Sequence, residues 1–155
     1  MTGPPAPRLP PVPDAGGRVL GAGLDLVHVP GLADQLAVAG SVFAQRAFTP
    51  RERREAARRA RQCGSRPAEH LAARWAAKEA FVKAWSAALH GSPPVMGHVA
   101  WHEIEIVSDP WHRPGIALHG EAARAFAESV GRARIHVSLS HDGPMAAAQA
   151  IVEAA

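Results

Sequence analysis

Two carboxylates, Asp25 and Glu79, lie in sequence contexts that suggest chemistry. Asp25 interrupts the apolar segment GAGLDLV, and burying a lone carboxylate is costly unless a cation or hydrogen-bond donors satisfy it. The alternative is an edge-strand aspartate that faces water. Glu79 lies in the segment ARWAAKEAFVKAW, four residues before Lys83. This spacing is typical of a solvated ion pair on a helix, but the small side chains of Ala72 and Ala76 beside the pair leave room for another group.

A strand aspartate and a helix glutamate together would supply two hard oxygen ligands. Two are too few for a closed protein cage, but they suit Mg²⁺, which keeps water ligands and takes others from phosphate. The pair therefore points to a phosphate-bearing substrate. Arg74, Lys78 and Lys83 flank it and could neutralise phosphoryl oxygens, which is most of what phosphoryl transfer requires of a protein.

Lys78 stands out within its expected helix, because it falls near the centre of an apolar stripe. That stripe consists of Leu71, Trp75, Val82, Trp85 and Leu89. The lysine stem could lie on the core while its ammonium reaches a site at the edge, as snorkelling side chains do. A structural and a functional role for Lys78 both remain open.

His141 ends the segment HVSLSH at a turn, with Ser138 and Ser140 on the same expected strand. A strand-end histidine is either a structural hydrogen-bonding residue or, if the strand end meets the metal pair, a functional one. The run of arginines from Arg51 to Arg66 is interleaved with Glu52 and Glu55, which is typical of a solvated helix face. Few aromatic residues accompany them to stack bases, so nucleic-acid binding is not expected.

The N-terminal part of the chain is expected to position Asp25 on a strand. Alternating apolar residues predict a strand that begins at Val19 and is ended by Pro30 and Gly31. Apolar residues at helical spacing then predict a helix from about Gly31 to Arg46.

Two further helices are expected in the middle of the chain. The segment FTPRE indicates a helix start, with Thr49 as N-cap and Glu52 completing a capping box, and the Arg-rich segment continues this helix to Gln62. After Gly64, strong helix formers predict a long helix from about Ala68 to Leu89.

The C-terminal part of the chain is expected to be mainly strands. Segments 101–108 and 116–120 suggest an antiparallel hairpin around the turn 109–115, 121–131 a helix, and 133–141 and 145–154 two strands. The last segment is so rich in alanine that a helix also remains possible. Strands and helices in this order predict an α+β fold, with helices packed on one face of a mostly antiparallel sheet.

The composition excludes several classes of protein. With 155 residues, 47% of them hydrophobic, the chain is expected to form a single domain over residues 18–155, preceded by a flexible proline-rich tail at 1–17. The single cysteine, Cys63, excludes an intrachain disulfide and a thiolate zinc cluster. No apolar run approaches the roughly 20 residues that span a bilayer, so no membrane contact is expected and the cytoplasm is the expected location. Net charge is +3 and the pI about 10.0, which makes an anionic partner plausible.

Four segments in this order and spacing resemble those of the holo-[acyl-carrier-protein] synthases, the small single-repeat 4'-phosphopantetheinyl transferases. They are GAGLDLV, FTPRE, ARWAAKEAFVKAW and HVSLSHDGPMAAAQAIVE. The resemblance runs from about Val19 to Glu153 and is strongest to actinobacterial members. It implies the 4'-phosphopantetheinyl transferase-like fold and transfer of the 4'-phosphopantetheine arm of coenzyme A to a serine of an apo acyl carrier protein, or of a carrier domain of a fatty-acid synthase. The other product would be adenosine 3',5'-bisphosphate.

The same resemblance implies roles for individual residues. Asp25 and Glu79 match the family's Mg²⁺ ligands, and Lys83 matches the lysine near the scissile pyrophosphate, which makes Glu79 and Lys83 the expected catalytic residues. Either Glu79 or a metal-bound water could accept the proton of the serine. Four residues match positions that contact coenzyme A in the family, namely Arg74, Lys83, Pro114 and His141. The family is a homotrimer with active sites between subunits, so the Asp25 side and the His141 side of one site are expected to come from different chains.

The surface for the carrier protein departs from the family pattern. His28 and Gly31 stand where an acidic residue and an arginine are usual, and the helix expected to follow is nearly free of basic residues. The next segment of the chain contains a cluster of arginines, namely Arg51, Arg53, Arg54, Arg58 and Arg59. Within this cluster, Arg53 and Arg54 are the expected carrier-docking residues. A non-catalytic module that binds an anionic protein or nucleotide through its Arg-rich helices is the alternative function.

Overall fold

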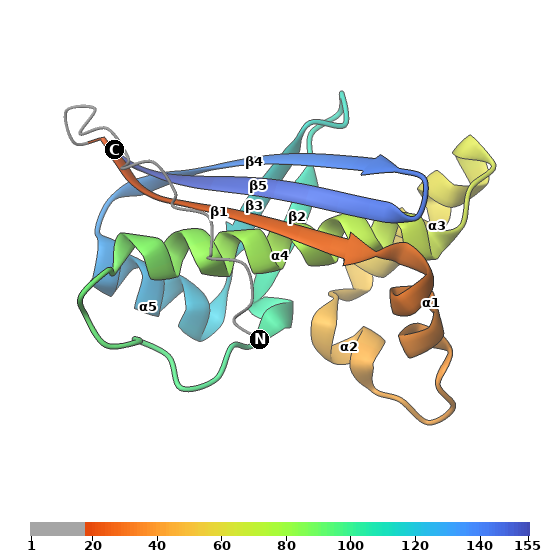
Figure 1. The fold of residues 1–155 in the computed structure, drawn as a ribbon, viewed down its shortest axis with the longest axis horizontal. Coiled ribbons are helices and arrows are strands. Elements are labelled where there is room, and N and C mark those ends of the chain that lie inside the picture. The colour runs from red at the N-terminus through yellow and green to blue at the C-terminus, as the bar shows by residue number, and fades with distance from the viewer. Residues whose placement is uncertain (1–17) are drawn as a thin grey trace, which may run out of the picture.

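Antiparallel pairing joins the first strand of the chain to the last two. The computed structural model describes residues 18–155, so the tail expected at 1–17 lies outside the described residues. β1 (Val19–His28), β5 (Met145–Ala154) and β4 (Ala133–Asp142) form a three-stranded sheet in the order β1-β5-β4. β2 (Ile104–Ser108) and β3 (Pro114–Leu118) form a separate antiparallel hairpin (Figure 1). The α+β fold with antiparallel strands is confirmed, with the strands divided between two sheets.

The helices follow the expected order along the chain, except that two helices stand where one was predicted over residues 31–46. They are α1 (Val29–Ala37), α2 (Phe43–Ala47), α3 (Pro50–Cys63), α4 (Pro67–Ala88), the 3-10 helix η1 (Trp101–Glu103) and α5 (Gly120–Val130). No helix of residues 18–155 is both long and apolar enough to cross a membrane.

The long helix α4 packs against one face of the three-stranded sheet (Figure 1). Gly21 and Gly23 allow this close approach, because a Cβ at either position would collide with a backbone carbonyl of α4. Alternate residues of a strand point to the same face, so Asp25 follows the two glycines on the side of the sheet that α4 covers. The segment GAGLD thus brings a carboxylate against the helix.

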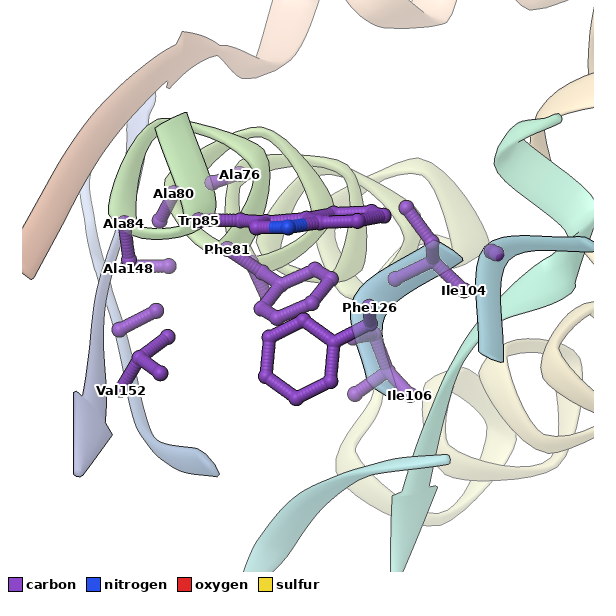
Figure 2. Close-up of a cluster of buried hydrophobic side chains, with 13 residues drawn as sticks. Ala76, Ala80, Phe81, Ala84, Trp85, Ile104, Ile106, Phe126, Ala148 and Val152 are labelled. Atoms are coloured by element: carbon purple, nitrogen blue, oxygen red, sulfur yellow. The ribbon is translucent and has the colours of Figure 1, made fainter. Parts of the chain in front are cut away.

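The core lies between α4, α5 and the two sheets. Phe81 and Trp85 of α4 pack against Phe126 of α5, with ring centroids 5.5 and 5.4 Å from it. Figure 2 shows these rings with Ile106 of β2 and Val152 of β5 around them. Burying each such side chain contributes about 1.5–3 kcal/mol, and the shared core fixes the hairpin relative to α4.

The prediction of one helix from Gly31 to Arg46 is wrong. α1 ends at Ala37 and α2 begins at Phe43, and between them Gly40 adopts a φ of 73°, which glycine tolerates best. α1 also begins two residues earlier than predicted. Pro30 occupies the first turn, where its missing N–H costs nothing, and the His28 Nδ1 accepts a hydrogen bond from the Gly31 N–H at 3.2 Å.

Other local predictions are confirmed with small changes of boundary. The capping box at α3 is present, since Thr49 Oγ1 accepts from the Glu52 N–H at 3.1 Å and Glu52 Oε2 from the Thr49 N–H at 2.8 Å. The alanine-rich segment 145–154 is strand β5, not a helix, and it pairs with both β1 and β4. The strand expected over 101–108 starts at Ile104, because the three residues before it form η1.

Candidate active site

Asp25 faces α4 and forms an ion pair there. Its side chain is only 9% exposed, so the alternative of an aspartate facing water is wrong. Lys83 Nζ donates to Asp25 Oδ1 at 2.7 Å and to the Leu24 carbonyl at 3.1 Å. Lys83 therefore pairs with a strand carboxylate 58 positions away, not with Glu79 on its own helix, and this hydrogen bond raises the pKa of Lys83.

Glu79 lies beside this ion pair. Burial, followed by the negative charge of Asp25, raises the pKa of the Glu79 carboxyl, while the positive charge of Lys83 opposes the shift. The structure thus brings together two neighbouring carboxylates and one half-exposed ammonium, as the sequence predicted. A carboxyl with a raised pKa is better matched to accept a proton near neutral pH.

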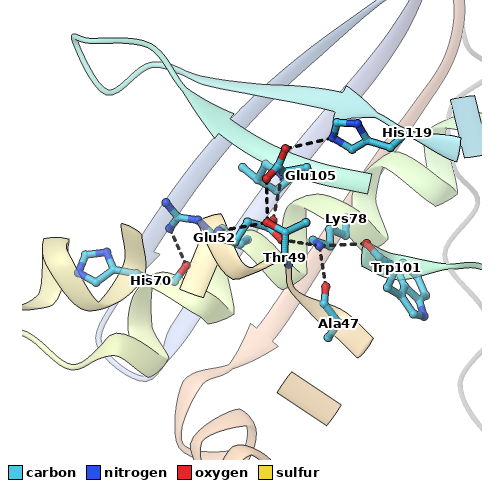
Figure 3. A network of polar contacts seen from close by, with 10 residues as sticks. Ala47, Thr49, Glu52, His70, Lys78, Trp101, Glu105 and His119 are labelled. Atoms are coloured by element: carbon cyan, nitrogen blue, oxygen red, sulfur yellow. Dashed lines mark hydrogen bonds and ion pairs between the residues drawn. The ribbon is translucent and has the colours of Figure 1, made fainter. Parts of the chain in front are cut away.

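Lys78 is not part of this group, and of the two roles that the sequence left open the structure supports the structural one, with the ammonium buried and not extended to an edge. The side chain is fully buried, and Nζ donates to Glu52 Oε2 at 2.8 Å and to the carbonyls of Ala47 and Trp101 at 2.6 and 3.0 Å (Figure 3). Burial lowers the pKa of Lys78, against the opposing charge of Glu52. Lys78 therefore links α4 to α2, α3 and η1 through hydrogen bonds. Its ammonium is not free to bind a phosphate.

Arg74, Pro114 and His141, the other predicted site residues, line one cavity of about 290 Å³. Arg74 comes from α4, Pro114 begins β3, and His141 lies near the end of β4. Arg74 is buried, and its Nη1 donates to the His70 carbonyl at 3.1 Å. The folded chain thus gathers three residues that lie far apart in the sequence.

The cavity and the carboxylate group lie on different flanks of α4. Arg74 and Glu79 are five residues apart, which on an α-helix means about 140° around the axis and about 7.5 Å along it. One chain therefore presents two groups of predicted site residues that do not face each other across α4.

Arg53 and Arg54 point in different directions, because successive helix residues are about 100° apart. Arg54 is exposed and lines a groove with Arg51 and Arg58, between α3 and the β2–β3 turn. Arg53 is half-buried on another face of α3.

The cavity is also lined by residues outside the predicted coenzyme A contacts, and His70 is one that the sequence analysis missed. His70, Arg59, Glu55 and His112 also line it. The spacing of His70, four residues before Arg74 on the same helix, is a signal that could have identified it. The positions of the others depend on how α3 and the β2–β3 turn pack against α4.

Comparisons with known proteins place the chain in a family. The model of the 4'-phosphopantetheinyl transferase superfamily matches residues 21–146. The holo-[acyl-carrier-protein] synthase of Corynebacterium glutamicum (strain R) is 46% identical over 136 residues, covering 86% of this chain and 98% of the relative. That of Mycobacterium tuberculosis (strain ATCC 25618 / H37Rv) is 47% identical over 136 residues, covering 88% and 98%.

Solved structures agree with the sequence comparison. The ACPS-CoA complex of Chronobacterium ammoniagenes matches with a TM-score of 0.79 and 45% identity, covering 87% of this chain and 97% of the other. The acyl carrier protein synthase of Mycobacterium tuberculosis matches with a TM-score of 0.67 and 42% identity, covering 88% and 99%. Because the family model spans most of the chain and these relatives match over nearly their whole length, the chain belongs to the 4'-phosphopantetheinyl transferase superfamily.

Proposed function

We propose that this chain transfers the 4'-phosphopantetheine arm of coenzyme A to a serine of an apo acyl carrier protein, releasing adenosine 3',5'-bisphosphate. The observation that carries the proposal is the group of Asp25, Glu79 and Lys83, two neighbouring carboxylates and an ammonium where β1 meets α4. It occurs in a chain 46% identical to a holo-[acyl-carrier-protein] synthase over 98% of that relative.

Intact-protein mass spectrometry tests this function directly. The full chain is incubated with coenzyme A, magnesium and several apo carrier proteins, and at least one carrier is expected to gain the mass of one phosphopantetheine. Omitting magnesium should stop the reaction. A chain that binds carriers or nucleotides but never adds this mass would instead be the non-catalytic module.

The carboxylates fit a magnesium ion as the cofactor. Mg²⁺ prefers oxygen ligands and is held by one or two protein carboxylates, with waters and substrate phosphates as its other ligands. Asp25 and Glu79 supply two carboxylates close enough for the charge of one to raise the pKa of the other, and no cluster of three or more such ligands occurs among residues 18–155. When bound, the ion would withdraw charge from the pyrophosphate and stabilise the leaving bisphosphate.

The remaining tasks fall to side chains of the chain itself. Lys83 is half-exposed, so its ammonium can reach phosphoryl oxygens and offset the charge that develops there. Either Glu79 or a metal-bound water would take the proton of the attacking serine. Arg74, Pro114 and His141 would hold the nucleotide part of coenzyme A in their cavity.

Replacing Lys83 by alanine is expected to lower kcat about 100-fold and to change KM for coenzyme A much less. A cation aimed at developing charge matters most in the transition state. Steady-state kinetics with saturating carrier measures both constants, and Arg132→Ala, an exposed cation outside the site, is the control. An increase confined to KM would make Lys83 a binding residue instead.

The two groups of site residues support a homotrimer with active sites between subunits. They lie on different flanks of α4, so one complete site would combine the carboxylates of one subunit with the cavity of the next. The outer face of the three-stranded sheet also exposes Leu24 and Leu26, at 60% and 61%, and exposed apolar side chains of this kind mark interaction surfaces.

The Arg-rich helix α3 is the proposed docking surface for the acidic carrier. Reversing Arg53 and Arg54 to glutamate should slow association and lower kcat/KM for the carrier about tenfold at low salt, with a smaller effect as salt rises. Arg54 should account for most of the change, since it is the exposed one of the two. Kinetic constants for coenzyme A should stay nearly constant.

Arg132→Glu provides the control for this charge reversal, because Arg132 is exposed and lies between α5 and β4. Figure 1 shows α5 and the start of β4 at the opposite end of the molecule from α3. Unchanged carrier kinetics in the double variant at low salt would favour apolar docking on α1 and the segment that connects it to α2, where Val38 and Val42 are exposed. The cytoplasmic location and the lack of nucleic-acid and membrane partners stay predictions.

A further inference from the structure

Three aromatic side chains line a groove between α2, α4 and η1. The groove has a volume of about 690 Å³, and Phe43, Trp75 and Trp101 lie along it. The Trp75 ring centroid is 5.4 Å from that of Phe43 and 4.7 Å from that of Trp101. All three rings are half-buried, so each leaves part of its surface to a ligand. Aromatic-lined grooves of this kind bind proline-rich segments in the polyproline II conformation.

Hydrogen bonds from Lys78 fix two walls of this aromatic groove. Its Nζ donates to the carbonyls of Ala47 and Trp101, and both of these residues line the groove (Figure 3). The groove is therefore formed before a ligand binds, which lowers the entropy that binding costs. Arg46 and His102 are exposed at the groove, and their N–H groups can donate to backbone carbonyls. A polyproline II helix leaves its carbonyls free for such bonds, because it has no internal hydrogen bonds.

The proline-rich tail of this chain has the pattern that such a groove binds. Every third residue over one stretch of MTGPPAPRLPPVPDAGG is a proline, namely Pro4, Pro7, Pro10 and Pro13. A polyproline II helix has three residues per turn, so the sequence predicts that these four prolines share one edge. Pro5 and Pro11 fall on a different edge. The tail lies outside the described residues, and its pattern is a feature of the sequence.

The tail joins the fold at a point from which it can reach the groove. Gly21 lies against the backbone of Ala88, so Arg18, three residues earlier, lies near the C-terminal end of α4. Trp75 is 13 residues before Ala88 on this helix, or about 20 Å along its axis. A polyproline II segment rises about 3.1 Å per residue, so the chain from Arg18 back to Pro7 would span about 34 Å. The prolines can therefore reach the aromatic groove of their own chain.

Apolar surface continues along α4 between these two points. A smaller cavity of about 190 Å³ is lined by Val82, Trp85 and Leu89, which lie between Trp75 and the end of the helix, and it shares Val99 with the aromatic groove. A chain that runs from Arg18 to the groove along α4 would thus cover apolar side chains on the way, which is favourable.

We propose that residues 4–13 bind in the aromatic groove of their own chain as a polyproline II helix, with the edge of Pro4, Pro7, Pro10 and Pro13 against Trp75 and Trp101. This interaction does not depend on the transferase function. The bound tail covers the segment of Val42 and Phe43, and a partner protein that binds there must displace it.

Trypsin cleavage after Arg8 measures this binding in the full chain. Intact-protein mass spectrometry follows the loss of residues 1–8, and the cleavage rate tracks the population of the unbound tail. Val42→Glu places a charge at an exposed position of the groove and is expected to raise the cleavage rate about tenfold. Val38→Glu is the matched control, because Val38 is exposed and does not line the groove. It should leave the rate at that of the wild type.

The indole N–H resonances in an NMR spectrum of the full chain locate the bound tail. Replacing both Pro7 and Pro10 by alanine removes two prolines of the binding edge, and it should shift the resonances of Trp75 and Trp101. The other two tryptophans of the chain do not line the aromatic groove, and their resonances should stay in place. These substitutions lie outside the described fold, so they test the proposal even if Val42→Glu unfolds the chain in a thermal melt.

Replacing both Pro5 and Pro11 by alanine is the matched control for the edge, and it should shift the same two resonances less. Equal shifts from the two pairs of substitutions would overturn the proposed edge. Unshifted resonances, or equal cleavage rates in the wild type and Val42→Glu, would overturn binding in this groove and leave the tail free for another protein. Protection from trypsin that is lost on dilution would place the tail in the groove of a second copy and overturn the assignment to its own chain.

Discussion

Asp25→Asn and Glu79→Gln are each expected to lower the transfer rate about 1000-fold while leaving the melting temperature close to that of the wild type. Each variant removes one of two carboxylates proposed to hold magnesium, and the stabilisation that such an ion gives is several kcal/mol, with about 1.4 kcal/mol for each factor of ten in rate. The fold should persist, because an asparagine can still accept a hydrogen bond from Lys83, which is half-exposed. Carrier modification followed by mass spectrometry measures the rate.

A thermal-shift titration separates a metal role from a purely catalytic one. A ligand that binds only the folded state raises its stability, so magnesium should raise the melting temperature of the wild type and not that of either variant. Glu128→Gln, an exposed acidic residue of α5, should respond to magnesium like the wild type. Near wild-type turnover in either variant at ordinary magnesium concentration would refute the metal assignment.

Lys78→Met is expected to lower the free energy of unfolding by about 3–5 kcal/mol, because it leaves the buried carboxylate of Glu52 without its countercharge. Lys78 and Glu52 are both fully buried, and the carbonyls of Ala47 and Trp101 would also lose their donor. Chemical denaturation followed by circular dichroism measures the loss. Lys83→Met makes the same substitution on the same helix at a half-exposed position, and it should cost less, because water reaches that ion pair from the lysine side.

A second substitution tests whether Lys78 and Glu52 act as an ion pair, because its effect on the free energy of unfolding should change sign when Lys78 is absent. Glu52→Gln should destabilise the wild type, because it removes the partner of Lys78 and weakens the bonds from the Thr49 and Ile106 N–H groups. In the Lys78→Met background the same change should be neutral or stabilising, because it removes an uncompensated buried charge. Additive losses would show that the two residues do not act as an ion pair.

Features that depend on residues close together in the chain could be predicted from the sequence. The capping box at Thr49 joins residues three apart, and α4 is built from strong helix formers, so both were predicted to within a residue or two. The order of the motifs was sufficient to identify the family and to select Asp25, Glu79 and Lys83. The break of the first helix at Gly40 was missed, because apolar residues on both sides kept a helical spacing across it.

The contacts of the charged side chains depend on the tertiary structure and could not be predicted from the sequence. Lys78 and Lys83 belong to one helical motif, yet one ammonium is buried against Glu52, 26 positions away, and the other lies at the surface against Asp25, 58 positions away. Helical spacing predicts neighbours only within one or two turns of the same helix. It therefore predicted Glu79 as the ion-pair partner of Lys83, and it predicted no ion-pair partner for Lys78. The cavity of Arg74 and His70 depends in the same way on α3, the hairpin and β4 meeting beside α4. The free energy of a buried charge is set by the groups that surround it in space, and those groups come together only when the chain is folded.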